Sequence, residues 1–96
     1  MVYIFYNPKS GKHDALKNAE LLSRTINAGF LIEDITTFNN KSDFFENLNE
    51  NDTIVICGGD GTLNRFINNH DCEKIKADIA YCPLGSLGVT TYTAKS

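Results

Sequence analysis

Three glycines that enclose an aspartate and precede a threonine make up the segment of this chain best suited to chemistry. The segment reads Gly58-Gly59-Asp60-Gly61-Thr62 and follows a short apolar run. Glycines let a backbone approach a ligand closely, and the free amides at the start of a helix attract anions. The segment therefore predicts a phosphate-binding turn between a strand and a helix.

Two better-known phosphate motifs do not fit this turn. A dinucleotide fingerprint that began at Gly59 would need its third glycine at position 64, where the chain has Asn64. A P-loop would need a lysine and then a serine or threonine after Gly61, but Thr62 and Leu63 follow. The turn therefore belongs to a third kind.

Two side chains of the turn could take part in chemistry. A carboxylate repels phosphate, so Asp60 could either hold Mg²⁺ or orient the turn by accepting backbone hydrogen bonds, and both roles stay open. Thr62 could cap the helix, bind a phosphate oxygen, or do both.

Two further polar turns follow apolar runs, Asn7-Pro8-Lys9-Ser10-Gly11 near the start and Pro83-Leu84-Gly85-Ser86 near the end. Taken alone, the first is an ordinary strand-to-helix turn. The glycine turn is expected at the same edge of a parallel sheet, so we interpret the first turn as a nucleotide contact. Its Lys9 and the neighbouring Lys12 would offer charge to phosphates.

The elements that position these turns are predicted from apolar patterning. Strands are expected at Val2–Tyr6, Phe30–Thr37, Thr53–Cys57 and Ala77–Cys82, and the second, the least apolar, is placed at an edge. Helical spacing predicts helices over 15–26, ended by Gly29 in a left-handed cap, around 44–48, and over 62–69. This β-α-β-α-β-α-β order predicts an α/β, three-layer Rossmann-like parallel sheet with helices on both faces. Its ligand crevice would lie at the carboxyl ends of the strands, where all three turns fall.

Composition limits the partners. The 96 residues allow one domain, and a net charge of −3 with a pI near 5.2 gives no indication of a nucleic-acid partner. No run approaches the ~20 apolar residues of a membrane span. We therefore expect no nucleic acid, no membrane span and a cytoplasmic location.

The three cysteines and His70 are residue types that can bind a metal. Cys57, Cys72 and Cys82 are an odd number without metal-ligand spacing, which indicates free thiols in a reducing compartment. Cys57 and Cys82 end apolar runs and are interpreted as small buried hydrophobes. His70 is interpreted as part of a solvated turn rather than of a metal cluster.

In their order, the three turns resemble the motifs of the diacylglycerol kinase catalytic domain family, which includes sphingosine and ceramide kinases. NAD kinases and phosphofructokinases carry related glycine turns. The resemblance spans nearly the whole chain. It implies a kinase, with ATP and Mg²⁺ as cofactors, that transfers a phosphoryl group to a lipid hydroxyl.

The resemblance and the residue types together assign a site. The catalytic and metal-binding role goes to Asp60. Nucleotide contacts go to Asn7, Ser10, Gly11, Lys12, Thr37, Gly58, Gly59, Gly61, Thr62, Asn64, Gly85 and Ser86. For the threonine, Thr36 or Thr37 fits the family position, and an ordinary strand-end threonine is an equal alternative. Arg65 departs from the acidic residue that many bacterial members place after the asparagine.

The end of the chain departs further from the family pattern. After Ser86 the family continues with Gly-Asn-Asp and a second domain that carries the general base, whereas this chain reads Leu87 to Ser96. We therefore expect residues 1–86 to be the nucleotide-binding domain and residues 87–96 a non-matching, disordered tail. The chain would be truncated and inactive alone. A shifted reading frame through residues 88–91 can spell Gly-Asn-Asp, which leads to the hypothesis of a frameshifted fragment.

Two other functions stay open at this point. One is a kinase of a soluble metabolite such as NAD, against which the turn at residues 7–11 argues. The other is a non-catalytic module that binds nucleotide or forms a homodimer through an exposed sheet cleft.

Overall fold

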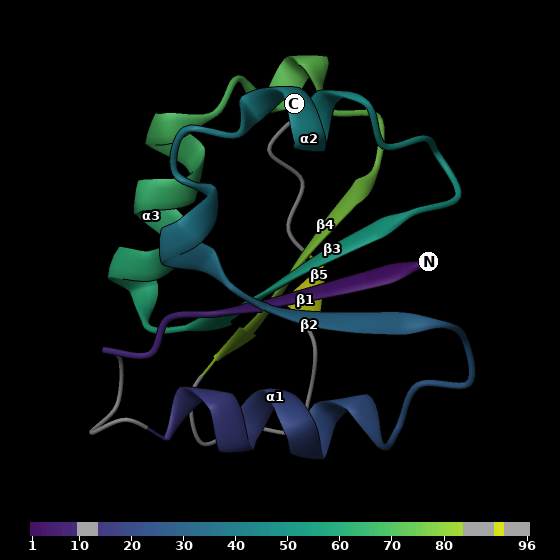
Figure 1. Cartoon of the computed structure of the whole chain (residues 1–96), viewed down its shortest axis with the longest axis vertical. Helices are drawn as coiled ribbons and strands as arrows, with labels where there is room; N and C mark the ends of the chain where they lie inside the picture. The colour runs from purple at the N-terminus through teal and green to yellow at the C-terminus, as the bar shows by residue number, and fades with distance from the viewer. Residues whose placement is uncertain (10–13, 84–89, 92–96) are drawn as a thin grey trace.

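The structure, a computed structural model, places helices on both faces of a sheet whose main strands run parallel (Figure 1). It describes residues 1–9 and 14–83 and the backbone of residues 90 and 91. The elements are β1 (Val2–Tyr6), α1 (Ala15–Ser23), β2 (Phe30–Asp34), the 3₁₀ turn η2 (Ile35–Phe38), α2 (Ser42–Glu46), β3 (Thr53–Gly58), α3 (Asp60–Asn69), the 3₁₀ turn η3 (Cys72–Lys74), β4 (Asp78–Pro83) and β5 (Thr90–Thr91).

The sheet order is β2-β1-β3-β4-β5. The first four strands pair in parallel, and the short β5 pairs antiparallel with β4. The predicted parallel α/β fold is therefore confirmed, and β2 lies at the edge of the sheet as expected. Because β1 and β3 are central, the turns that follow them are brought side by side at the carboxyl edge.

Two apolar cores form because alternate residues of each buried strand point to opposite faces of the sheet. On one face α1 covers a core of Ile4, Ala19, Leu22, Val55, Cys57, Ala80 and Cys82. On the other face α2 and α3 cover a larger core built around Phe5, Phe45, Ile54, Ile56 and Phe66. The rings of Phe5, Phe38, Phe44, Phe45 and Phe66 pack edge-on or tilted in one continuous cluster.

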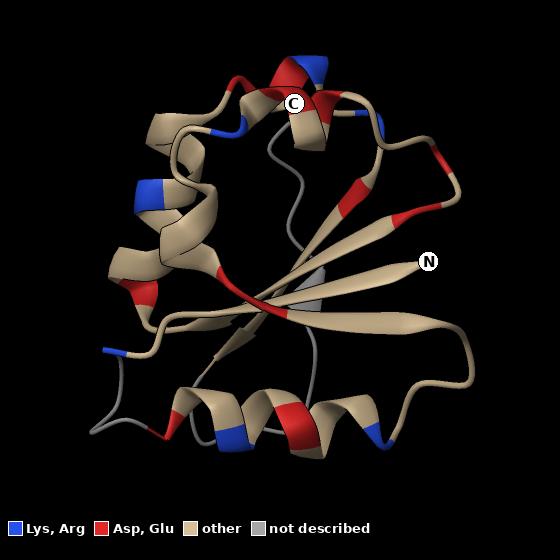
Figure 2. Cartoon of the chain, viewed as in Figure 1, with Lys and Arg blue, Asp and Glu red and all other residues tan. Residues whose placement is uncertain are grey.

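Charged residues gather on the helices and at the ends of strands, while the middle of the sheet is free of them (Figure 2). None of the helices in the described part of the chain has the length and apolar character needed to cross a bilayer.

The predicted end of one helix and the predicted end of one strand are wrong. In each case a polar side chain forms a hydrogen bond with a backbone group near the end of the element. The helix expected over 15–26 ends at Ser23. There the hydroxyl of Ser23 donates a hydrogen bond to the Glu20 carbonyl at 2.6 Å, and the hydroxyl of Thr25 donates one to the Leu22 carbonyl at 2.8 Å. Gly29 does not adopt the predicted left-handed conformation, since Gly58 is the one described glycine with positive φ.

The strand expected over 30–37 stops at Asp34. The carboxylate of Asp34 accepts hydrogen bonds from the amide and the hydroxyl of Thr36, at 2.8 and 2.6 Å, and so caps the turn η2. This Asx-type turn bends the chain over the sheet edge instead of extending β2. As a result, η2 lies near α3, and residues of both elements line a common cleft.

The expectation for His70 is also wrong. Its side chain is only 6% exposed and packs between the rings of Phe45 and Phe66, with centroids 4.7 and 5.0 Å away. By contrast, the prediction that Cys57 and Cys82 are small buried residues is confirmed, because neither has any exposed surface.

Candidate functional site

The glycine turn begins with a residue that must be glycine. Gly58 ends β3 with φ of +158°, and a Cβ atom there would lie 2.7 Å from Oγ1 of Thr62. Both the backbone angle and the space exclude a side chain. The turn therefore packs closely against Thr62, whose side chain is buried.

The next residues present backbone rather than side chains. Gly59 is the N-cap of α3, and its carbonyl accepts from the amides of Thr62 and Leu63 at 3.0 and 3.4 Å. The amides of Asp60 and Gly61 come before the first intrahelical acceptor, so they point out of the helix start. A Cβ atom at Gly59 or Gly61 would meet nothing within 4 Å. This open space lets an anion reach the positive end of α3.

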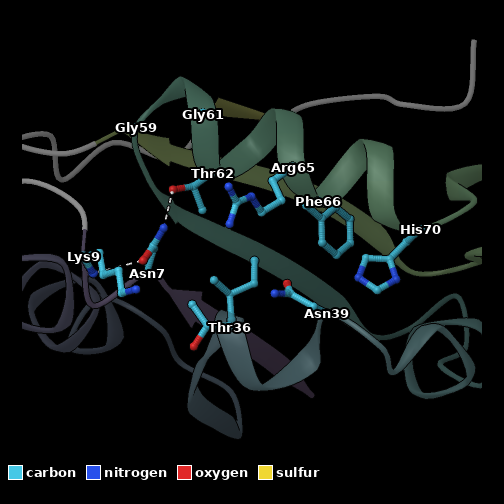
Figure 3. A pocket seen from close by; sticks show the side chains of 11 residues that line it. Asn7, Lys9, Thr36, Asn39, Gly59, Gly61, Thr62, Arg65, Phe66 and His70 are labelled. Carbon is cyan, nitrogen blue, oxygen red and sulfur yellow. Dashed lines mark hydrogen bonds between the residues drawn. The ribbon is translucent and has the colours of Figure 1, made fainter.

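The turn after β1 joins the glycine turn directly. The Asn7 side-chain amide donates to Oγ1 of Thr62 at 3.3 Å, and the amide of Lys9 donates to Oδ1 of Asn7 at 2.9 Å (Figure 3). Asn7 thus links the ends of β1 and β3. Two turns that are 50 residues apart in sequence form one surface because their strands are neighbours in the sheet.

Asp60 is held from the side of β4. The hydroxyl of Tyr81 lies 3.0 Å from the Gly58 carbonyl oxygen and 3.2 Å from Oδ1 of Asp60, and shares its proton between them. Burial, followed by the neighbouring Asp60 carboxylate, raises the pKa of Tyr81, so the phenol stays protonated as a donor. Asp60 itself is exposed.

A cleft of about 370 Å³ extends from the glycine turn along α3. Its lining comes from the turn after β1, from η2 and from α3, as Figure 3 shows. The lining residues are Asn7, Lys9, Ile35, Thr36, Asn39, Gly59, Gly61, Thr62, Arg65, Phe66 and His70.

The charge of this cleft has the opposite sign to that of the whole chain. The chain carries a net charge of −3. Among the described residues that line the cleft, Lys9 and Arg65 are cationic and none is an aspartate or glutamate. With the start of α3, the two cations make an electrostatic environment that favours anions.

The far end of the cleft is less polar. Ile35, Phe66 and the ring of His70 line it, together with the amide of Asn39. Burial lowers the pKa of His70 despite the opposing effect of Glu46, and Nδ1 of the ring lies 2.7 Å from the Ser42 hydroxyl. His70 is therefore neutral at pH 7 and contributes an aromatic surface. One end of the cleft suits phosphate and the other suits a flat, apolar group.

The structure brings together some of the residues assigned from sequence. Asn7, Gly59, Gly61 and Thr62 line the cleft, and Gly58 shapes the turn beneath them. Asn64 and Thr37 do not line it: Asn64 is exposed on α3, and the hydroxyl of Thr37 donates to the Asp34 carbonyl at 2.8 Å. The remaining assigned positions, Ser10, Gly11, Lys12, Gly85 and Ser86, lie outside the described residues.

Sequence reasoning missed part of the cleft. Asn39 and Phe66 line it, and so do Arg65 and His70, whereas Thr36, which also lines it, was one of the two threonines that the sequence offered. The spacing 62, 65, 66 marks one face of a helix and could have placed Arg65 beside Thr62. Nothing in the sequence places η2 opposite α3, because that depends on where β2 stops.

Fold and site define a Rossmann-like α/β domain with a cationic cleft at the carboxyl edge of its parallel strands. The chain matches the family described as diacylglycerol kinase catalytic domain over residues 1–95, and it belongs to that family. The predicted resemblance is thereby confirmed, and the family is one of kinases. Comparison with curated proteins and comparison with solved structures each gave no match.

Proposed function

We propose that this chain is the ATP-binding part of a lipid kinase, in which the cleft holds the nucleotide that donates a phosphoryl group to a lipid hydroxyl. The observation that carries the proposal is the bond from Asn7 to Thr62, which joins two turns at the open, positive start of α3. Phosphoryl transfer requires positioning and charge neutralisation more than covalent help from the protein. A turn of this kind supplies both.

The residues present fit a nucleotide. The amides of Asp60 and Gly61 would bind phosphate oxygens, and Lys9 would add positive charge. The apolar end of the cleft would take the base, against Phe66 and His70. ATP, when bound, supplies the phosphoryl group.

One carboxylate fits a role as a magnesium ligand. Mg²⁺ is commonly held by one or two carboxylates together with the phosphates of the substrate. Asp60 stands at the start of α3, and Tyr81 fixes one of its oxygens, which would leave the other for the ion. No group of three metal-ligating side chains occurs in the part of the chain that the structure describes. We therefore propose that Mg²⁺ binds together with nucleotide and not before it.

We also infer that residues 1–83 bind nucleotide without transferring its phosphate. Transfer to a lipid needs a base within hydrogen-bond reach of the hydroxyl. Among the described lining residues, the group that titrates near neutrality is His70, and its Nδ1 is engaged by Ser42. Incubation of the chain with ATP, Mg²⁺ and diacylglycerol micelles should form no phosphorylated lipid.

The proposal is tested by amide NMR spectra of the labelled 96-residue chain during titration with ATP and Mg²⁺. We expect shifts at residues 58–62, 7–9 and 65–66, and few elsewhere. Asn7→Ala should weaken ATP binding severalfold, because it removes the link to Thr62. The matched control, Asn27→Ala, changes an exposed asparagine at the opposite edge of the sheet and should leave binding unchanged. An unchanged spectrum at millimolar ATP would instead favour a non-catalytic module.

A further inference from the structure

Arg65 differs from the other cations of the described chain in where it stands and in what surrounds it. It lies on α3, four residues after Gly61, and lines the cleft. Residues four apart share a helix face, and they are displaced by about 6 Å along the axis at 1.5 Å per residue. Figure 3 shows its side chain extending from α3 over the cleft, close to Thr62.

The guanidinium has no counter-ion within the described residues. The ion pair found there joins the Met1 amine to Asp52, far from the cleft. Two acidic side chains, at the end of β2 and at the start of α3, bond to other groups: Asp34 accepts two bonds from Thr36, and Asp60 accepts from Tyr81. A cation on an exposed helix face is ordinarily just solvated. This one instead faces an anion-favouring cleft whose described lining contains no carboxylate.

The chemistry of the two ends of the cleft leaves a definite place for this charge. The start of α3 can serve one phosphate with its free amides. Arg65 stands one turn further, between those amides and the apolar end at Phe66. Guanidinium binds phosphate through two parallel N–H donors, which a single backbone amide cannot do.

We propose that Arg65 is a specificity-determining residue that binds a second phosphate of the nucleotide, next to the nucleoside. This inference rests on the proposed function, and it assigns the position to phosphate recognition. The alternative for this position is contact with ribose hydroxyls, for which an acidic side chain would serve better than a cation. If Arg65 binds phosphate, a negative charge at position 65 should weaken ATP binding. If this position contacts ribose, a negative charge there should strengthen ATP binding.

The test is the dissociation constant of ATP for the full chain and its variants, measured by NMR titration at low salt. Arg65→Ala should weaken ATP binding about tenfold or more, as expected for a lost charged hydrogen bond. Arg65→Glu should bind more weakly than Arg65→Ala, because a carboxylate repels phosphate. Arg65→Lys should fall between the alanine variant and the original chain, since it keeps the charge but loses the paired donors.

Arg24→Ala is the matched control. It removes one positive charge from the end of α1, at the opposite edge and on the opposite face of the sheet, and should change the dissociation constant less than twofold. The difference between Arg65→Ala and the original chain should also shrink at 0.5 M salt, which a purely structural effect would not do. Arg65 is exposed, so the amide spectrum of each variant should show an intact fold.

Three results would overturn the inference. If Arg65→Ala binds ATP as well as Arg24→Ala does, Arg65 makes no phosphate contact, although the proposed function stands. If Arg65→Glu binds ATP more tightly than Arg65→Ala does, the side chain at position 65 contacts ribose and not phosphate. If the original chain does not bind ATP at all, the proposed function fails and the inference fails with it.

Discussion

At the scale of single residues, the site depends most on the absence of a side chain at Gly58. Its φ of +158° is in a region that L side chains rarely adopt, and Thr62 occupies the space a Cβ atom would need. We expect Gly58→Ala to lower the free energy of unfolding by roughly 1–3 kcal/mol, the cost of a strained backbone position. Urea unfolding followed by circular dichroism measures this.

Gly61→Ala is the control for that prediction. A Cβ atom at Gly61 meets nothing within 4 Å, and the position is helical. Alanine there should be neutral or should stabilise the chain by up to about 1 kcal/mol. If both variants unfold at the same urea concentration, the turn is not strained at Gly58.

These two glycines also show what could be read from sequence at this scale. The three-glycine pattern indicated a phosphate turn, because glycine has few other uses in such density between a strand and a helix. The pattern did not separate the glycine that is needed for conformation, Gly58, from those that leave space, Gly59 and Gly61. That distinction depends on the position of the buried Thr62 side chain, which tertiary contacts such as the bond from Asn7 help to fix.

At the scale of elements, His70 joins α3 to α2. Its ring packs on Phe45 and Phe66, and Nδ1 bonds with Ser42. Burial lowers the pKa of His70 below its ordinary value of about 6.5. The unfolded chain therefore binds a proton at this residue at a higher pH than the folded chain does. Consequently the stability that His70 contributes is complete above pH 6.5 and is lost as the pH falls below it.

This dependence predicts a difference between the chain and a variant without the imidazole. Between pH 7 and pH 5, the free energy of unfolding should fall more steeply for the original chain than for His70→Asn, which keeps a hydrogen-bond acceptor but does not titrate in this range. Urea unfolding at a series of pH values measures both slopes. Parallel slopes would mean that the ring is protonated in the folded state without cost.

Element boundaries were the least predictable part of the fold, and His70 and Asp34 show why. The apolar runs of the strands were sufficient to predict where four strands lie in the sequence and that they form a parallel sheet, because burial on both faces leaves few polar residues in a strand. The end of β2 was missed because one carboxylate, that of Asp34, captures the amide of Thr36. His70 was predicted to lie in a solvated turn because its neighbours in the sequence are polar, whereas its neighbours in space are the rings of Phe45 and Phe66.

At the scale of the whole molecule, the two cores seal all three thiols. Cys57, Cys72 and Cys82 are buried, and Cys57 and Cys82 face each other in register on β3 and β4. Burial raises the pKa of the Cys57 thiol far above its usual range, and the neighbouring Cys82 raises it further. Burial restricts the access of a reagent to all three thiols in the folded state, and at Cys57 it also disfavours the reactive thiolate.

We therefore expect a thiol reagent such as dithionitrobenzoate to modify the folded chain slowly at pH 8. The rate should follow opening of the fold, and all three cysteines should react within seconds in 6 M guanidinium. Absorbance at 412 nm records the reaction. Rapid modification of one thiol without denaturant would show that one core opens independently of the other.

The central position of β1 has a consequence for how the chain is made. Ile4 and Phe5 are fully buried, and one of the strands that bury them is β3, which ends at Gly58. A ribosome releases the apolar segment of β1 well before that partner exists, because β3 begins only at Thr53. During this interval the nascent chain can offer β1 the edge strand β2 and the helices α1 and α2, but no strand on its other side. The apolar segment of β1 therefore lacks one of its two flanking strands until β3 is made, and we expect a chaperone to bind it during translation.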